Sequence, residues 1–156
     1  AELVTSHLSK SKRVADLFSG SGTFALRLAK KAKVHAVEAE APGLAALDKA
    51  WREAEGLKPV TTERRDLFRR PLLLKDLKPY DGLVFDPPRA GAEGVAAELA
   101  RSNVKRVAAV SCNPQTLARD LKLLLSGGYR LVSVTPIDQF LWSHHVEAVA
   151  LLEKGG

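Results

Sequence analysis

The sequence predicts an α/β fold in which a parallel sheet carries helices on both faces. Short apolar runs alternate with segments of helical spacing along the 156 residues, which is typical of parallel sheets with crossover helices. The stretch from Val14 to Phe24 has the pattern of a buried strand, a glycine turn and the start of a helix. Polar residues follow several apolar runs, and such sheets bind ligands at the carboxyl ends of their strands. The sequence therefore predicts a ligand site at that edge.

Each predicted element has a local reason. Strands are predicted where apolar residues run together, and helices where they recur every three or four positions, as between Leu44 and Trp51. Glycine ends two helices, at Gly56 and at Gly127-Gly128, and Asp86-Pro87-Pro88 stops the fourth strand because proline donates no ladder hydrogen bond. In chain order we predict a helix at 2–8, a strand at 13–18, a helix at 23–31, a strand at 33–38, a helix at 43–56, strands at 60–65 and 80–85, a helix at 94–101, a strand at 104–110, a helix at 114–125, and strands at 129–137 and 146–152.

Length, composition and charge narrow the function classes. The 156 residues suit one domain, and no apolar run approaches the roughly 20 residues that span a membrane. Without a signal-peptide pattern or any methionine, residues 1–156 are expected to be one domain of a longer cytoplasmic protein. The single cysteine excludes an internal disulfide and a multi-cysteine zinc site. A net charge of +6 is compatible with RNA as a partner, and the candidates for a basic surface are Lys10, Lys12, Arg64, Arg65, Arg69 and Arg70.

The glycine turn predicts a nucleotide-like ligand above the first strand. Gly20 and Gly22 permit positive φ and a close approach of a ligand to the backbone. Ala25 completes a G-x-G-x-x-A pattern and is small enough for close packing between strand and helix. Loops of this kind bind NAD, FAD or S-adenosylmethionine, and some are only tight turns, so this pattern leaves the ligand open.

Three acidic residues at the ends of predicted strands are candidate ligand contacts. Glu38 ends the second strand, where a carboxylate can accept both ribose hydroxyls of a nucleoside. Asp66 follows the third strand and is a candidate acceptor for an adenine amino group; the alternative is an acid that balances the neighbouring arginines. Asp86 precedes two prolines, which fix a rigid turn and hold its carboxylate at the sheet edge. The alternative for Glu38 is a solvated acid at a strand end, and the alternative for Asp86 is a purely structural turn.

The segment Ser111-Cys112-Asn113-Pro114 contains a candidate nucleophile. Cys112 lies at the end of the fifth strand, and Asn113 and Pro114 are favourable as N-cap and first residue of the next helix. The N-terminus of a helix favours the thiolate form of a nearby thiol, which is the nucleophilic form. The alternative is that Cys112 is a small buried hydrophobic residue, which its position after the strand disfavours.

The segment His144-His145-Val146-Glu147 contains a candidate base. Adjacent histidines of an extended segment point to opposite faces and cannot share one metal ion, so we predict no metal site. Glu147 precedes the apolar residues of the last strand, where packing gives little reason for a carboxylate. Either Glu147 or His145 is therefore a candidate base at the sheet edge.

Four motifs, in this order, resemble those of the RNA (uracil-5-)-methyltransferases, the enzymes that make 5-methyluridine in transfer or ribosomal RNA. They are Asp16-Leu-Phe-Ser-Gly-Ser-Gly-Thr-Phe24, Asp86-Pro-Pro-Arg-Ala-Gly91, Ser111-Cys-Asn-Pro-Gln-Thr-Leu117 and Asp138-Gln-Phe-Leu-Trp-Ser-His-His-Val-Glu147. The resemblance implies a Rossmann-like class I methyltransferase fold, with a seven-stranded, mostly parallel sheet whose last strand is antiparallel. It also implies S-adenosylmethionine as the cofactor and RNA as the partner.

The resemblance further implies the roles of individual residues. Cys112 is the expected nucleophile, which adds to carbon 6 of uracil, and Glu147 is the expected base, which removes the carbon 5 proton after methylation. Asp66 is expected near the adenine. The residues expected to line the cofactor site are Phe18, Gly20, Gly22, Thr23, Glu38 and Asp86.

The chain departs from the family pattern in two ways. Ser19 and Thr23 stand where relatives often have cysteine and asparagine, and a hydroxyl still forms hydrogen bonds there. Family members usually carry an aromatic–Gln–Asn segment and an RNA-binding domain upstream of the glycine loop, and we expect both outside these 156 residues. Two alternatives stay open. An amino-group nucleic-acid methyltransferase usually has an aromatic residue at the position of Arg89, and an NAD-binding Rossmann domain has a similar glycine loop.

Overall fold

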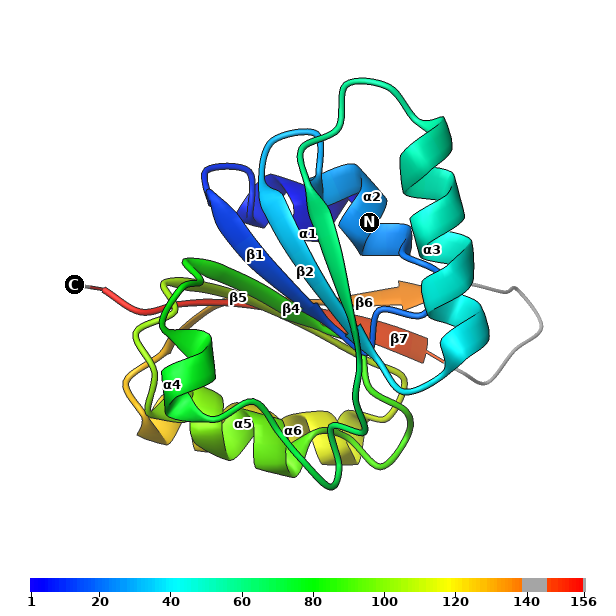
Figure 1. The fold of residues 1–156 in the computed structure, drawn as a ribbon. Helices are drawn as coiled ribbons and strands as arrows, with labels where there is room; N and C mark the ends of the chain where they lie inside the picture. Colours follow the sequence, from blue (N-terminus) through cyan, green and yellow to red (C-terminus); the bar gives the residue numbers. More distant parts are fainter. Residues whose placement is uncertain (139–145, 156) are drawn as a thin grey trace.

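A single seven-stranded sheet lies between two layers of helices in the computed structural model, which describes residues 1–138 and 146–155 (Figure 1). The sheet order is β3-β2-β1-β4-β5-β7-β6. All neighbouring pairs among the first five strands are parallel, and β7 is antiparallel to both β5 and β6. The predicted fold class, including the antiparallel last strand, is confirmed. The strands are β1 (Arg13–Leu17), β2 (Lys33–Glu38), β3 (Val60–Arg64), β4 (Gly82–Phe85), β5 (Arg106–Ser111), β6 (Arg130–Asp138) and β7 (Val146–Glu153).

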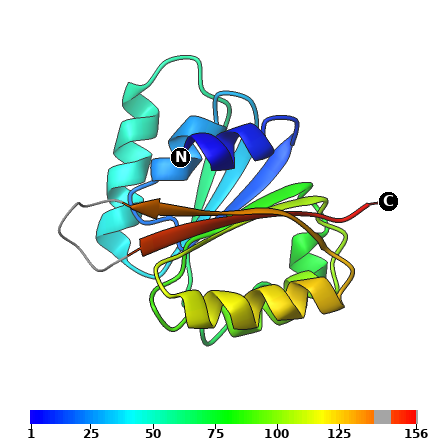
Figure 2. The ribbon, with the colours of Figure 1, turned by 180° about the vertical axis from the view of Figure 1, so that it is seen from behind.

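Helices cover both faces of the sheet. One layer consists of α1 (Glu2–His7), α2 (Thr23–Leu28) and α3 (Ala41–Glu53), and the other of α4 (Leu74–Leu77), α5 (Glu93–Ala100) and α6 (Pro114–Ser126) (Figures 1 and 2). No helix in the described part of the chain is both long enough and apolar enough to cross a membrane.

The sheet separates two hydrophobic cores because successive side chains of a strand point to opposite faces. In β1, Val14 packs in the core beneath α1 and α2, whereas Ala15 and Leu17 pack in the core beneath α5 and α6. Strands buried on both faces have near-continuous apolar sequences, as parallel sheets require. The apolar runs that predicted the strands therefore reflect burial from both sides.

The differences from the predicted elements lie mainly at helix ends. The helix predicted over 23–31 ends at Leu28, and the helix predicted over 43–56 spans residues 41–53. The short helix α4 was not predicted. Its start is fixed by a local hydrogen bond, in which the Leu73 N–H donates to the Asp76 carboxylate at 3.0 Å. Four residues are too few to show helical periodicity in a sequence.

Candidate active site

The carboxyl edge of the sheet brings together residues that are far apart in the sequence. Asp16 of β1 pairs in register with Ala36 of β2 and Val84 of β4. The Asp86 N–H donates to the Leu17 carbonyl at 3.2 Å, which extends the pairing of these strands by one residue. The glycine loop, Glu38, Asp86 and Cys112 therefore follow neighbouring strands at one edge, as predicted.

The glycine loop has the positive φ angles that the sequence predicts. Gly20 has φ +55° and Gly22 has φ +93°. A Cβ atom added at Gly20 would meet no atom within 4 Å, so the space beside this backbone is open to a ligand. Thr23 is exposed at the start of α2, and Ala25 is fully buried where strand and helix pack.

Phe18 is a strained residue at the entrance of this loop. Its φ of +60° is uncommon outside glycine and asparagine, and strained residues of this kind cluster at ligand sites. The following N–H, of Ser19, donates to the Val37 carbonyl at 3.1 Å and holds the turn against β2. The Phe18 ring lies 5.5 Å from the ring of Phe68, measured between centroids, and Phe68 is 55% exposed. The positive φ of Phe18 and the proximity of Phe68 were not predicted.

Glu38 fastens the glycine loop to the end of β2. Its Oε1 accepts the Gly20 N–H at 3.0 Å, and its Oε2 accepts the Glu40 N–H at 2.8 Å. Each carboxylate oxygen has a further lone pair for a ligand hydroxyl. The contact with a ribose stays a prediction, and the structure adds a role in shaping the loop.

Asp66 shapes the turn after β3. Its Oδ1 accepts the N–H groups of Phe68 at 2.9 Å and Arg69 at 3.4 Å, and the Arg69 Nε lies 3.8 Å from Oδ2. This is the local role that the sequence offered as the alternative to an adenine contact. The carboxylate still borders the cavity described next, so the adenine contact stays a prediction.

A cavity of about 440 Å³ lies at this edge of the sheet. Phe18, Glu38, Asp66 and Asp86 all line it, together with Phe68. A larger hollow, of about 800 Å³, lies beside α1 and α2, but none of the predicted site residues borders it. The smaller cavity is therefore the candidate ligand site.

Two aspartates near this cavity have raised pKa values. Burial, reinforced by the neighbouring charge of Asp86, raises the pKa of Asp16 to about 8. Burial, reinforced by the charge of Glu147, raises the pKa of Asp86 to about 6. Asp16 is fully buried, and neither of its carboxylate oxygens has a hydrogen-bonding partner of good geometry among the described residues, although hydrogen bonding to the Ala25 backbone opposes the rise in its pKa. Sequence analysis did not select Asp16 as a site residue. An acidic residue within the apolar run of β1 was a signal that could have identified it.

Cys112 and Glu147 adjoin the last residue pair that β5 and β7 form at this edge of the sheet. Ser111 of β5 pairs with Ala148 of β7 in an antiparallel register, so Cys112, which follows Ser111, and Glu147, which precedes Ala148, lie at the same edge. Cys112 is half-buried and follows the strand, which excludes the alternative of a buried core residue. The Asn113 side chain accepts the Gln115 N–H at 3.1 Å, so the predicted N-cap of α6 is confirmed.

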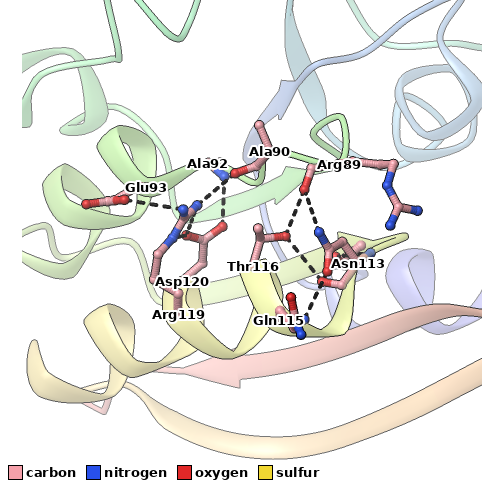
Figure 3. A network of polar contacts seen from close by, with 10 residues as sticks. Arg89, Ala90, Ala92, Glu93, Asn113, Gln115, Thr116, Arg119 and Asp120 are labelled. Carbon is pink, nitrogen blue, oxygen red and sulfur yellow. Dashed lines mark hydrogen bonds and ion pairs between the residues drawn. The ribbon is translucent and has the colours of Figure 1, made fainter.

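The turn that follows Asp86 is fastened to α6, the helix that follows Cys112 (Figure 3). Asn113 Nδ2 and Thr116 Oγ1 both donate to the Arg89 carbonyl, at 3.0 and 3.1 Å. The Arg89 guanidinium points away from these contacts (Figure 3). The turn after Asp86 and the start of α6, which are distant in the sequence, are thus held side by side.

Arg119 and Asp120 complete this attachment, which we call the turn clamp (Arg89–Ala92 held by Asn113, Thr116, Arg119 and Asp120). Arg119 Nη2 donates to the Ala90 carbonyl at 2.9 Å and to Asp120 Oδ1 at 3.1 Å. The Ala92 N–H donates to Asp120 Oδ2 at 2.8 Å. Asp120 is only 1% exposed, so these bonds compensate the burial of its charge. The clamp was not predicted, because its partners are 24 to 29 residues apart.

The six candidates for a basic surface do not form one surface. Lys10 and Lys12 precede β1, whereas Arg69 and Arg70 follow β3, so the two pairs lie at opposite ends of parallel strands. Arg65 is largely buried and structural. It donates to the carbonyls of Arg70 and Pro71 at 2.6 and 2.9 Å and forms an ion pair with Glu63.

Part of the last predicted motif lies outside the described residues, including His144 and His145. Within residues 1–138 and 146–155, no group of three His, Cys, Asp or Glu side chains is arranged to hold a metal ion.

Comparisons with known proteins identify the family to which this chain is similar. The family model of the tRNA (uracil-5-)-methyltransferases matches residues 3–155. An uncharacterized RNA methyltransferase of Agrobacterium fabrum is 68% identical over 154 residues, 99% of this chain and 37% of that protein. A 23S rRNA (uracil(1939)-C(5))-methyltransferase of Hahella chejuensis is 38% identical over 147 residues, 90% of this chain and 33% of that protein. This chain thus spans little more than a third of the curated relatives that it matches.

A solved structure shows the same likeness. The Pyrococcus abyssi tRNA (uracil-54, C5)-methyltransferase, in complex with S-adenosyl-L-homocysteine, superposes with a TM-score of 0.79 at 30% identity. The match covers 97% of this chain and 37% of that one.

Proposed function

The chain belongs to the tRNA (uracil-5-)-methyltransferase family, and we propose that it transfers a methyl group from S-adenosylmethionine to carbon 5 of a uridine in RNA. The observation that carries this proposal is that Cys112 and Glu147 adjoin the last pair of β5 and β7, Ser111 and Ala148, at the carboxyl edge of the sheet. Family membership also distinguishes the chain from an amino-group methyltransferase and from an NAD-binding domain. The rRNA and tRNA enzymes among its relatives support RNA as the substrate class.

The residues around the 440 Å³ cavity fit S-adenosylmethionine. The open space beside Gly20 allows a ligand to lie against the backbone of the loop. Glu38 has lone pairs for ribose hydroxyls, and Asp66 and Phe68 border the space for an adenine. Glu38 and Asp86 provide negative charge for a cationic ligand. When bound, S-adenosylmethionine supplies an electrophilic methyl group.

Cys112 is the proposed nucleophile. Carbon 5 of uracil is a poor nucleophile until a group adds to carbon 6, and addition of the Cys112 thiolate at carbon 6 gives carbon 5 enolate character. The Asn113 cap and Pro114 start α6 directly after Cys112 in the chain. The turn clamp holds the start of this helix against the turn that follows Asp86.

Glu147 is the proposed base. After carbon 5 has been methylated, its proton must leave so that the Cys112 sulfur can be eliminated. Glu147 precedes Ala148, and Ala148 pairs with Ser111, the residue before Cys112. This shared edge supports Glu147 as the base for a uracil bound to that sulfur. The target uridine has to leave any base stack to reach this edge, so single-stranded or loop RNA is the expected substrate form.

The test separates the two roles by the fate of the covalent adduct. Cys112→Ala should abolish both methyl transfer from labelled S-adenosylmethionine and any protein–RNA adduct. Glu147→Gln should also stop turnover, but it should accumulate a methylated protein–RNA adduct that survives a denaturing gel. The experiment uses the full-length protein and RNA from cells that lack its gene.

Glu153→Gln is the matched control. Glu153 lies on the same strand as Glu147 but at the opposite edge of the sheet, where it pairs with Arg106 and Arg130. This variant should turn over like the wild type and accumulate no adduct. An inactive Glu147→Gln variant without adduct would remove Glu147 from the role of base, and methylation by Cys112→Ala would overturn the covalent route.

A further inference from the structure

Three carboxylates lie along one face of the sheet at its carboxyl edge. Val14, Val84 and Val149 all pack in the core beneath α1 and α2. Asp16 and Asp86 come two residues after Val14 and Val84, and Glu147 comes two residues before Val149. Because strand side chains alternate between faces, all three acids point to the same face as these valines. We call Asp16, Asp86 and Glu147 the acidic row.

The charges that raise the pKa values of Asp16 and Asp86 are all negative. The charges of Asp86 at the end of β4 and Glu38 at the end of β2 raise the pKa of Asp16, whereas hydrogen bonding to the Ala25 backbone in α2 lowers it. Asp86 is influenced in turn by Glu147 from β7. Neither oxygen of the fully buried Asp16 has a hydrogen-bonding partner of good geometry among the described residues. A buried carboxylate of this kind is costly unless it is neutralised by a proton or by a cation.

We propose that the acidic row distinguishes S-adenosylmethionine from its demethylated product by charge, and that binding of the sulfonium cation releases a proton from Asp16 and Asp86. This inference rests on the proposed function, because it takes S-adenosylmethionine as the cofactor. The sulfonium form carries one positive charge more than the thioether product. That charge, in the cavity which Asp86 and Glu38 line, replaces the proton as the partner of the carboxylates.

The raised pKa values of Asp16 and Asp86 make this exchange measurable near neutral pH. The pKa of Asp16 is raised to about 8 and that of Asp86 to about 6, so the two carboxyls together hold about one proton at pH 7. Proton release and ligand affinity are linked reciprocally. The affinity for the sulfonium form therefore rises with pH between about 6 and 8, by up to about tenfold per pH unit for one proton released. The neutral thioether displaces no proton from these groups.

The test is isothermal titration calorimetry of the full-length protein with S-adenosylmethionine and with S-adenosylhomocysteine. Titrations at pH 6, 7 and 8 in buffers of different ionisation enthalpy give the number of protons released with each ligand. The expected result is proton release and a pH-dependent Kd for the sulfonium form, and neither for the thioether. Asp16→Asn, which keeps the shape and removes the charge, should lower the proton release and flatten the pH dependence.

Asp48→Asn on α3 is the matched control, because Asp48 is exposed and pairs only with Arg52 among the contacts described. It should behave like the wild type. If Asp16→Asn does not fold, Asp86→Asn tests the same link between cation binding and proton release. The number of protons released per bound ligand can be measured even if this variant binds more weakly. Equal proton release with both ligands, or an unchanged count in a folded Asp16→Asn variant, would overturn the inference. Absence of binding by both ligands would instead overturn the proposed function.

Discussion

Glu38 illustrates how one side chain at this edge serves both the fold and the site. Its two oxygens accept backbone N–H groups from Gly20 and Glu40, so the carboxylate sets the shape of the glycine loop. Glu38 also borders the cavity in which a ribose is expected. Local loop geometry and ligand binding therefore depend on the same charge.

Replacement of Glu38 by Ala should weaken cofactor binding strongly. Hydrogen bonds to a charged group contribute about 1.5–3 kcal/mol, which corresponds to a loss of about 10- to 150-fold in affinity. Calorimetric titration with S-adenosylhomocysteine measures this loss. Glu40→Ala is the control, because Glu40 contributes its backbone N–H, which the substitution keeps. A Glu38→Ala variant with wild-type affinity would refute the assigned contact.

The turn clamp connects two elements that each carry a part of the proposed chemistry. It joins the turn after β4, which contains Asp86, to the start of α6, which follows Cys112. Gly91 lies inside the clamp with φ +76°. A Cβ atom there would lie 2.6 Å from Arg119 Nη2, 2.8 Å from Thr116 Cβ and 3.0 Å from Asp120 Oδ2. A side chain at this position would therefore push the clamp apart.

Gly91→Ala should destabilise the protein more than Gly56→Ala does. Gly56 has the same φ of +76°, but a Cβ atom there meets nothing within 4 Å, so this control measures backbone strain alone. Strain of this kind costs about 1–2 kcal/mol, and forced overpacking adds about 1–3 kcal/mol. Urea unfolding of the two variants measures the difference. Equal losses in the free energy of unfolding would show that the clamp accommodates the added methyl group without loss of stability.

The folded molecule as a whole holds a proton that the unfolded chain would lose. Burial of Asp16 in the centre of the sheet raises its pKa from 3.8 to about 8. A group whose pKa is raised by folding stabilises the folded state fully below its unfolded pKa and loses that effect as the pH rises through its folded pKa. The free energy of unfolding should therefore fall between about pH 4 and pH 8, by at most about 1.4 kcal/mol per pH unit for this proton.

Asp16→Asn should remove the part of this slope that Asp16 contributes. The amide keeps the shape of the protonated acid but does not ionise, so the variant should gain stability relative to the wild type as the pH rises toward 8. Urea unfolding followed by circular dichroism at pH 5 to 9 measures both proteins, with Asp48→Asn as the control for a change at an exposed acid. Parallel pH profiles of wild type and Asp16→Asn would contradict the assignment of the proton to Asp16.

The sequence by itself determined the features that depend on neighbours along the chain. Alternating apolar runs predicted the strands because these strands are buried on both faces. Gly20 and Gly22 predicted positive φ, and Asn113 and Pro114 predicted the start of α6, because turns and caps are made by adjacent residues. Placing Cys112 after a strand followed from the same local rules.

The tertiary structure alone decided the features that depend on strand order and register. The order β3-β2-β1-β4-β5-β7-β6 brings Asp16 beside Asp86, and the antiparallel register of β5 and β7 brings Cys112 and Glu147 to the same edge of the sheet. The fold also places Lys12 and Arg69 at opposite ends of the parallel strands, and a count of charges in the sequence cannot show this separation. Burial from several elements at once raises the pKa of Asp16, and no local pattern contains that information, because desolvation is a property of the packed molecule.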